Sequence, residues 1–180
     1  LAASASPSMA TAASRSTTDL DAAIALFMAQ DYEGALVSLE TVVAEDPENA
    51  DAHAWLAEVH RRLRDPDSAF AEASRAVELE PCHAFAYNVL GEVHTEIHGA
   101  SVYSDDERAW ECFFKAAQCD PDDGNPWLTI WSLAMSRGDE KAEGLAIERM
   151  HETGFFTPAA YELARWFLRD LPENAVLLTN

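Results

Sequence analysis

Apolar residues recur at steps of three and four along most of the chain, which is the period of an amphipathic helix. The two clearest stretches are residues 50–63, with Ala52, Trp55, Leu56, Val59 and Leu63, and residues 69–77, with Ala69, Phe70, Ala73, Ala76 and Val77. Between them, Asp65-Pro66 is typical of a helix start, because a carboxylate caps the first turn and proline lacks only an N–H that has no helical partner there. The pattern predicts two short antiparallel helices joined by a turn.

The same helix pair recurs along the chain. Pro47, Pro81 and Pro121 each follow an acidic residue, and they stand 34 and 40 residues apart. An alanine lies twelve residues before each proline, at positions 35, 69 and 109. The longer unit is therefore a 34-residue unit with six additional residues before its alanine. We expect an all-α protein built from repeated helix pairs.

The six additional residues fall between two helices of one pair. His98-Gly99 has the form of a helix end, and residues 100–103 are expected to form a loop. Ser104-Asp105-Asp106-Glu107 then has the form of a capping box. The next helix is expected to begin there.

These units resemble the tetratricopeptide repeat, in particular that of bacterial proteins, whose 34 residues carry Trp-x₂-Leu-Gly-x₂-Tyr, then Ala-x₃-Phe, then Pro. The best match reads Tyr87-x₂-Leu90-Gly91-x₂-His94, Ala109-x₃-Phe113 and Pro121. The resemblance implies an antiparallel helix-pair solenoid, wound as a right-handed superhelix, with repeats at residues 18–49, 50–83, 84–123 and 124–154. In the last, degenerate repeat Trp131 stands where a small residue normally allows the helices to approach.

The two ends of the chain carry different expectations. Residues 1–17 consist mostly of Ala, Ser and Thr, which is typical of a flexible leader. Residues 155–170 are expected to form a helix that covers the open face of the last repeat. Residues 171–180 contain a strand-like apolar run, which is either a frayed tail or the truncated start of a further domain.

The chain is strongly acidic. Its 32 Asp and Glu residues against 12 Lys and Arg residues give a formal net charge of −20. Nucleic acid is therefore not expected as a partner, because its binders need a basic surface. No apolar run approaches the roughly 20 residues of a membrane helix, so we expect no membrane insertion by this segment. Such a surface suits high salt, and many mesophilic proteins are acidic too, so a halophilic origin stays an open alternative.

The cysteines are Cys82, Cys112 and Cys119, an odd number without the spacing of a disulfide framework. Cys112 and Cys119 lie seven residues apart on one expected helix, about 10 Å along its axis and beyond disulfide reach. We therefore expect free thiols and a cytoplasmic location. The alternatives are the periplasm or a soluble domain of a membrane protein.

No motif for catalysis occurs in the sequence: there is no phosphate loop, Gly-rich dinucleotide motif, GxSxG or HExxH. We expect no enzyme activity, no catalytic residue and no cofactor. His94 and His98 are four residues apart, share a helix face and form a weak candidate metal pair. The simpler interpretation is that His94 packs between helices and that His98 is a cation near a helix C-terminus.

The resemblance implies that the first helix of each repeat lines a concave groove. The groove residues carried over to this chain are Leu20, Ile24, Phe27, Met28, Glu58, Arg61, Arg62, Phe85, Asn88, Glu92 and Glu96. The Lys, Asn and Arg residues with which well-known members grip peptide carboxylates are replaced here by residues such as Trp55 and Val89. We therefore expect apolar anchors to bind in the groove, with acidic neighbours drawn to Arg61 and Arg62.

The sequence favours a non-catalytic protein–protein interaction module. Its partner would be a protein that offers a peptide or helix segment to the groove, and the chain would act as a scaffold or adaptor. The alternative is a regulatory or capping domain of a larger, membrane-tethered enzyme whose catalytic part lies beyond residue 180. Residues 171–180 weakly resemble the entry to a soluble domain in some large bacterial membrane proteins.

Overall fold

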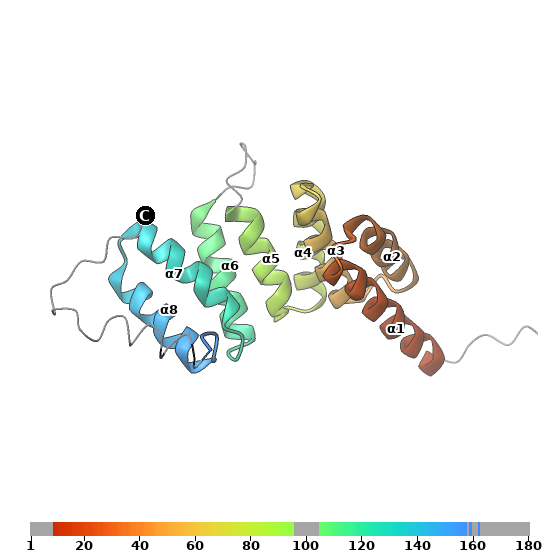
Figure 1. The fold of residues 1–180 in the computed structure, drawn as a ribbon. Helices are drawn as coiled ribbons and strands as arrows, with labels where there is room; N and C mark the ends of the chain where they lie inside the picture. Colours follow the sequence, from red (N-terminus) through yellow and green to blue (C-terminus); the bar gives the residue numbers. More distant parts are fainter. Residues whose placement is uncertain (1–8, 96–104, 158, 160–161, 163–180) are drawn as a thin grey trace, which may run out of the picture. The chain divides into compact units, whose positions relative to one another are not determined.

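Eight α-helices make up the described part of the chain, which covers residues 9–95, 105–157, 159 and 162 of a computed structural model (Figure 1). They are α1 (Met9–Met28), α2 (Tyr32–Glu45), α3 (Ala50–Arg62), α4 (Pro66–Leu79), α5 (Ala84–Thr95), α6 (Asp106–Cys119), α7 (Asn125–Arg137) and α8 (Glu140–Glu152). These residues include no β-strand. The chain divides into two compact units, residues 1–120 and residues 121–180.

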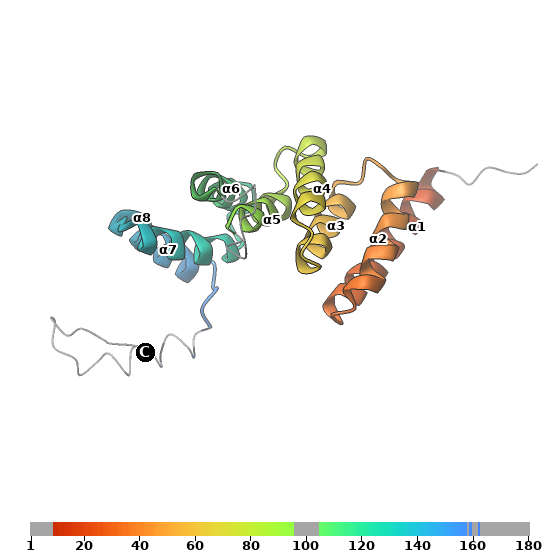
Figure 2. The same cartoon turned by 90° about the horizontal axis from the view of Figure 1, so that it is seen from above.

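Helices that follow one another in the sequence pack as pairs. In the first unit α1 pairs with α2, α3 with α4 and α5 with α6, and neighbouring pairs also contact each other (Figure 2). In the second unit α7 pairs with α8. The prediction of an all-α solenoid of helix pairs is confirmed. No helix in the described part combines the length and the apolar character needed to cross a membrane.

Short polar side chains begin most helices, as the sequence pattern predicts. Asp65 caps α4, since its carboxylate accepts the backbone N–H of Ser68 at 3.2 Å, and Pro66 occupies the first turn. Hydrogen bonds from the side chain and the backbone of Ser68 lower the pKa of Asp65 below its ordinary value of 3.8. Asp105 caps α6 in the same way, by accepting the N–H groups of Glu107 and Arg108. The cap of α6 is thus Asp105, whereas Ser104 lies outside the described residues.

The N-terminal boundary differs from the prediction. Helix α1 begins at Met9, inside the segment expected to be a flexible leader at residues 1–17. Alanine is the strongest helix former, so the Ala-rich residues that precede the repeat can extend its first helix. The expected capping helix at residues 155–170 and the tail at 171–180 lie largely outside the described residues.

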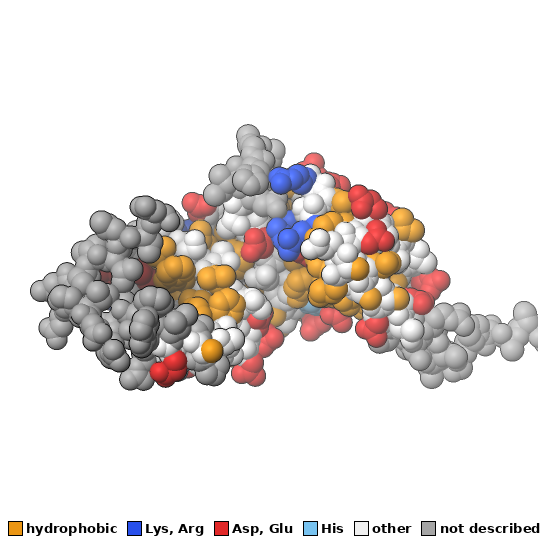
Figure 3. Space-filling model, viewed as in Figure 1, with side chains coloured by type: hydrophobic (Ala, Val, Ile, Leu, Met, Phe, Trp, Pro, Cys, Tyr) orange, Lys and Arg blue, Asp and Glu red, His pale blue; other side chains and the backbone are white. Residues whose placement is uncertain are grey.

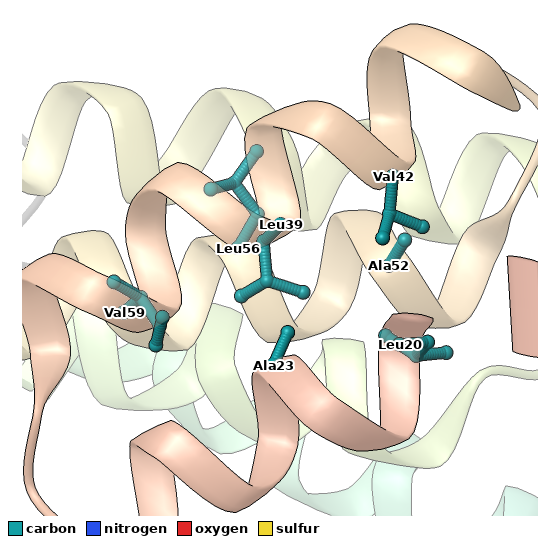
Figure 4. Close-up of a cluster of buried hydrophobic side chains, with 8 residues drawn as sticks. Leu20, Ala23, Leu39, Val42, Ala52, Leu56 and Val59 are labelled. Carbon is teal, nitrogen blue, oxygen red and sulfur yellow. The ribbon is translucent and has the colours of Figure 1, made fainter. Parts of the chain in front are cut away.

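The first hydrophobic cluster joins α1, α2 and α3. Figure 4 shows Leu20 and Ala23 of α1 pointing toward α2 and α3; the other labelled side chains are Leu39, Val42, Ala52, Leu56 and Val59. All of these side chains are at most 8% exposed. Leu56, predicted from its spacing to be a core residue, is confirmed as one. Leu90 is likewise buried, in a second cluster that joins α3, α4 and α5.

Small residues allow the helices to approach closely. Ala57, Ala69 and Ala73 are fully buried where α3 and α4 meet α5. In the third pair Gly91 faces Phe113, and a Cβ atom placed on Gly91 would lie 2.7 Å from Cζ of that ring. Gly91 is therefore needed to admit the fully buried Phe113 side chain.

Two cysteines form a disulfide, which corrects the expectation of three free thiols. Cys82, in the turn between α4 and α5, pairs with Cys119, the last residue of α6, with their Cα atoms 5.2 Å apart. The two lie 37 residues apart, close to one repeat length, so the solenoid brings equivalent turns of successive repeats side by side. The expected cytoplasmic location rested on free thiols and loses that support. Cys112 stays a free thiol.

The second unit is a single helix pair in its described part. Its buried residues include Trp127, Ile130 and Ala134 of α7 and Ala146 and Met150 of α8. Gly138 ends α7 in the left-handed region at φ 67°, a conformation that glycine adopts without strain. Trp131 is half-buried, so this bulky residue is accommodated at the helix contact position without full burial.

Candidate protein-binding face

Four aromatic side chains form a continuous row across the first unit, called here the aromatic row. The ring centroids of Tyr32 and Phe27 are 5.4 Å apart, those of Phe27 and Trp55 5.3 Å, and those of Trp55 and Phe85 4.6 Å. Tilted and edge-to-face arrangements at such distances are favourable for aromatic pairs. The row therefore links three helix pairs through one set of contacts.

The first helix of each pair supplies one ring of the row. Phe27 lies near the end of α1, Trp55 near the middle of α3 and Phe85 at the start of α5, so the row crosses these helices obliquely. Tyr32 extends it from the first residue of α2. All four side chains are half-buried. Phe27 and Trp55 pack on the first hydrophobic cluster and Phe85 on the second, which holds the rings in place while part of each stays accessible.

A cluster of one carboxylate and two guanidinium groups borders the row. Glu58 accepts hydrogen bonds from Nε and Nη2 of Arg61, at 2.7 and 2.8 Å, and from Nε of Arg62, at 2.7 Å. The Arg62 guanidinium also lies 5.9 Å from the centre of the Phe27 ring, within range of a cation–π interaction. One carboxylate between two cations leaves this end of α3 with positive charge.

The side chains of Arg61 and Arg62 differ in their exposure to solvent. The Arg61 side chain is 14% exposed and that of Glu58 7%, whereas the Arg62 side chain is 47% exposed. Arg61 therefore forms a half-buried ion pair with Glu58, and Arg62 is the more accessible cation of the two. Arg64, exposed just beyond α3, adds a further positive charge. Figure 3 shows Lys and Arg side chains gathered over the region of α3 and α4, beside hydrophobic and acidic side chains.

The structure divides the remaining predicted groove residues. Leu20 is only 8% exposed and belongs to the core, so it does not line a surface; its spacing on α1 turns it toward α2 and α3. Ile24 packs against the same cluster, while Met28 is 66% exposed beside Phe27 at the end of α1. Asn88 and Glu92 are half-buried on α5, and Glu96 lies outside the described residues.

Two residues of the row were not in the set of groove residues carried over from the family. Trp55 was expected only on the apolar face of its helix and as a replacement for a residue that grips peptide carboxylates, and Tyr32 begins the second helix of its pair. The sequence feature that could have identified these two residues is the presence of an aromatic residue on each of α1, α3 and α5. That signal is hard to recognise, since these residues occupy different positions of the repeat.

A cavity of about 400 Å³ adjoins the row at Phe85; its lining residues are Asp51, Glu80, Cys82, His83, Ala84, Phe85, Cys119 and Asp120. His83 is buried here, and its Nδ1 accepts the backbone N–H of Ala86 at 3.2 Å. Because Nδ1 accepts, the donor of the ring is Nε2, which donates to the Asp51 carboxylate at 3.1 Å. His83 thus caps α5 and ties it to α3.

The structure gives no support to His94 and His98 as a metal-binding pair. His94 is buried, and its ring lies 5.9 Å from that of Phe70 in an edge-to-face arrangement, as expected of a packing residue. His98 lies outside the described residues. Among the residues that the structure describes, no group of three or more His, Cys, Asp or Glu side chains is placed to hold a metal ion.

Sequence comparison relates the chain to one family. Residues 26–84 match the family model of the tetratricopeptide repeat. Tetratricopeptide repeat protein 37 of Xenopus laevis is 29% identical over 118 residues, which make up 63% of this chain. The chain spans only 7% of the length of that relative.

Structural comparison agrees with that relation. A thermophilic TPR protein of Thermus thermophilus matches with a TM-score of 0.66 at 17% identity, covering 88% of this chain and 93% of its own. YrrB, described as a TPR protein with an unusual peptide-binding site, matches with a TM-score of 0.58 at 17% identity, covering 85% and 76%. The first TPR of Spaghetti, solved with an HSP90 peptide, matches with a TM-score of 0.59 at 15% identity, covering 69% and 94%. Residues 26–84 are thus similar in sequence to the tetratricopeptide repeat, and the fold of the chain is that of solved tetratricopeptide-repeat proteins.

Proposed function

We propose that the first unit binds a peptide or helix segment of a partner protein on the aromatic row, and that the chain acts as a non-catalytic scaffold or adaptor. The observation that carries this proposal is the row itself, four half-buried rings that cross three helix pairs. Large aromatic side chains with part of their surface accessible are typical anchors of protein interfaces. Two solved neighbours that are described as peptide-binding proteins add support.

The charges beside the row select the chemistry of the partner. Arg62 is exposed next to Phe27, on a chain whose net charge is −20. A segment with apolar anchors and a neighbouring acidic residue would gain from both features. The acidic surface elsewhere would repel acidic segments that cannot reach this place. The same surface disfavours nucleic acid as a partner.

The test begins with a peptide selected against the full chain from a random display library. Its affinity is then titrated on Phe85→Ala and on Arg62→Glu. We expect either change to weaken binding by roughly tenfold or more, equivalent to about 1.4 kcal/mol. Arg61 is left intact in this test, because changing it would also break its ion pair with Glu58.

Arg75→Glu is the matched control. Arg75 lies on α4, its side chain is 45% exposed, and it pairs with a glutamate as Arg62 does. Circular dichroism shows whether each variant keeps its helices. Unchanged affinity in both Phe85→Ala and Arg62→Glu, with the fold intact, would refute the proposed face.

A further inference from the structure

The disulfide lies beside the proposed binding face. Cys82 and Cys119 line the same cavity as Phe85, the last ring of the aromatic row. Cys82 is an exposed residue and Cys119 is half-buried. Only two residues separate Cys82 from Phe85.

The turn that carries Cys82 fixes the start of α5 in three ways. The disulfide joins it to the end of α6. His83, the next residue, caps α5 through the N–H of Ala86 and binds Asp51 of α3 through Nε2. The position of Phe85 therefore depends on a turn that is held by one covalent bond and two hydrogen bonds, in addition to its packing against Trp55 and the second hydrophobic cluster.

The rest of the third helix pair does not depend on the disulfide. Near the middle of α5, Phe113 of α6 packs against Gly91. At the far end, the backbone N–H of Asp105 donates to the carbonyl of His94 at 3.1 Å. Loss of the bond would release one end of the pair and leave these contacts in place.

We propose that the Cys82–Cys119 disulfide is a redox-controlled clasp that holds Phe85 in the binding face when oxidised and releases it when reduced. The inference rests on the proposed function, because it assigns a regulation to the same face. Reduction requires a dithiol reductant. Its thiolate attacks the sulfur of Cys82, the more exposed of the two residues, the S–S bond breaks, and Cys119 leaves as a thiolate that takes up a proton.

The second thiol of the reductant then resolves the mixed disulfide. The Cys82 thiolate is released and protonated, and the reductant keeps a new disulfide. Two electrons and two protons have passed to the protein, which now carries two thiols. Cys112 does not interfere, because burial raises the pKa of this thiol to about 11 and leaves it protonated at neutral pH.

The first measurement compares hydrogen exchange in the oxidised and the reduced full chain. Reduction should speed exchange at the start of α5, including the N–H of Ala86, by roughly tenfold, whereas amides in the middle of α6 should keep their protection. Cys82→Ser should show the faster exchange without any reductant. Cys112→Ser is the control and should respond to reductant as the unchanged chain does.

The second measurement uses 8-anilinonaphthalene-1-sulfonate as a probe of the face, because it is aromatic and anionic. In the unchanged chain, reduction should weaken its binding several-fold, and Cys82→Ser should bind weakly in either condition. Phe85→Ala and Arg62→Glu should weaken binding of the dye to the oxidised chain.

The outcomes separate the two proposals. Equal exchange and equal dye affinity in the oxidised and reduced chain would overturn the clasp; if Phe85→Ala and Arg62→Glu still weakened binding, the proposed function would stand. If neither variant changed the dye affinity, the proposed face would be overturned, and with it the regulatory role of the disulfide. Both proposals would be supported if reduction changed both hydrogen exchange and dye affinity, and if Phe85→Ala and Arg62→Glu weakened dye binding.

Discussion

The second helix pair (α3 and α4) and the third (α5 and α6) place side chains of different size at the same contact between their two helices. Ala57 of α3 and Gly91 of α5 hold the same position in successive repeats, where the first helix of each pair meets the second. On the second helices, Ala73 of α4 corresponds to Phe113 of α6. The second pair thus uses two small residues, whereas the third combines the smallest residue with a large ring.

This difference shows that the sizes of the two facing side chains are matched within each helix pair. A ring as large as Phe113 fits only because the opposing residue has no side chain, and a Cβ atom there would lie 2.7 Å from the ring. Protein interiors are packed densely enough for such a mismatch of one methyl group to be felt. The repeat therefore tolerates different residues at each position as long as partners change together.

The two pairs also differ in charge. Glu58 of α3 is followed by Arg61 and Arg62, which it binds. One repeat later Glu92 of α5 is followed at the corresponding positions by Thr95 and Glu96. The positive end of α3 is therefore a feature of one pair and does not belong to the repeat.

The largest effect is expected from Phe113→Ala. The side chain is fully buried against Gly91, so its loss leaves a cavity that no neighbour fills, and the free energy of unfolding should fall by about 3–5 kcal/mol. Ala73→Gly is the corresponding change in the second pair and should cost only about 1 kcal/mol, mainly through helix propensity. Denaturant unfolding followed by circular dichroism compares them. Equal losses would contradict the size-matching explanation.

A smaller loss is expected from Glu58→Gln. This change removes the charged acceptor of Arg61 and Arg62, and the mostly buried Arg61 cannot regain full hydration. The free energy of unfolding should fall by about 1–3 kcal/mol. Glu78→Gln on α4 is the control and should cost less, because Glu78 also pairs with an arginine but its side chain is 67% exposed. The result fails the prediction if both changes have the same effect in denaturant unfolding.

Gly91→Ala tests the close approach directly. The added methyl group clashes with Phe113 at a cost of about 1–3 kcal/mol, partly offset by a gain in helix propensity of about 1 kcal/mol. Combining it with Phe113→Leu should relieve the clash, so the two changes should couple favourably in a double-mutant cycle. A Gly91→Ala chain more stable than the original would show that the ring can shift without cost.

The smallest effect concerns Asp65, the cap of α4. Asp65→Ala should cost about 1 kcal/mol, whereas Asp65→Asn keeps a capping acceptor and should cost less. Hydrogen bonds from Ser68 lower the pKa of Asp65 below 3.8, so the ionised cap stabilises the fold above that ordinary value. Its contribution is lost as the pH falls through the lowered pKa. Thermal unfolding across acidic pH should show this dependence for Asp65 and not for Asp65→Asn.

Much of the fold follows from local patterns in the sequence. The turn at Asp65-Pro66 and the burial of Leu56 and Leu90 follow from helix caps and from the helical period. The start of α1 at Met9 was not predicted, because a composition of Ala, Ser and Thr is compatible with both a leader and a helix. Leu20 was assigned to the groove by its place in the repeat, yet packing turns it into the core.

The sequence by itself determined the helix pairs of this protein, because caps, prolines and the spacing of apolar residues act within a few residues of each other. Only the tertiary structure decided which of these residues meet across repeats. Phe27, Trp55 and Phe85 hold different repeat positions, and Cys82 and Cys119 lie 37 residues apart. Their contacts depend on the offset between neighbouring helix pairs, and that offset is set by the sizes of side chains packed between the pairs.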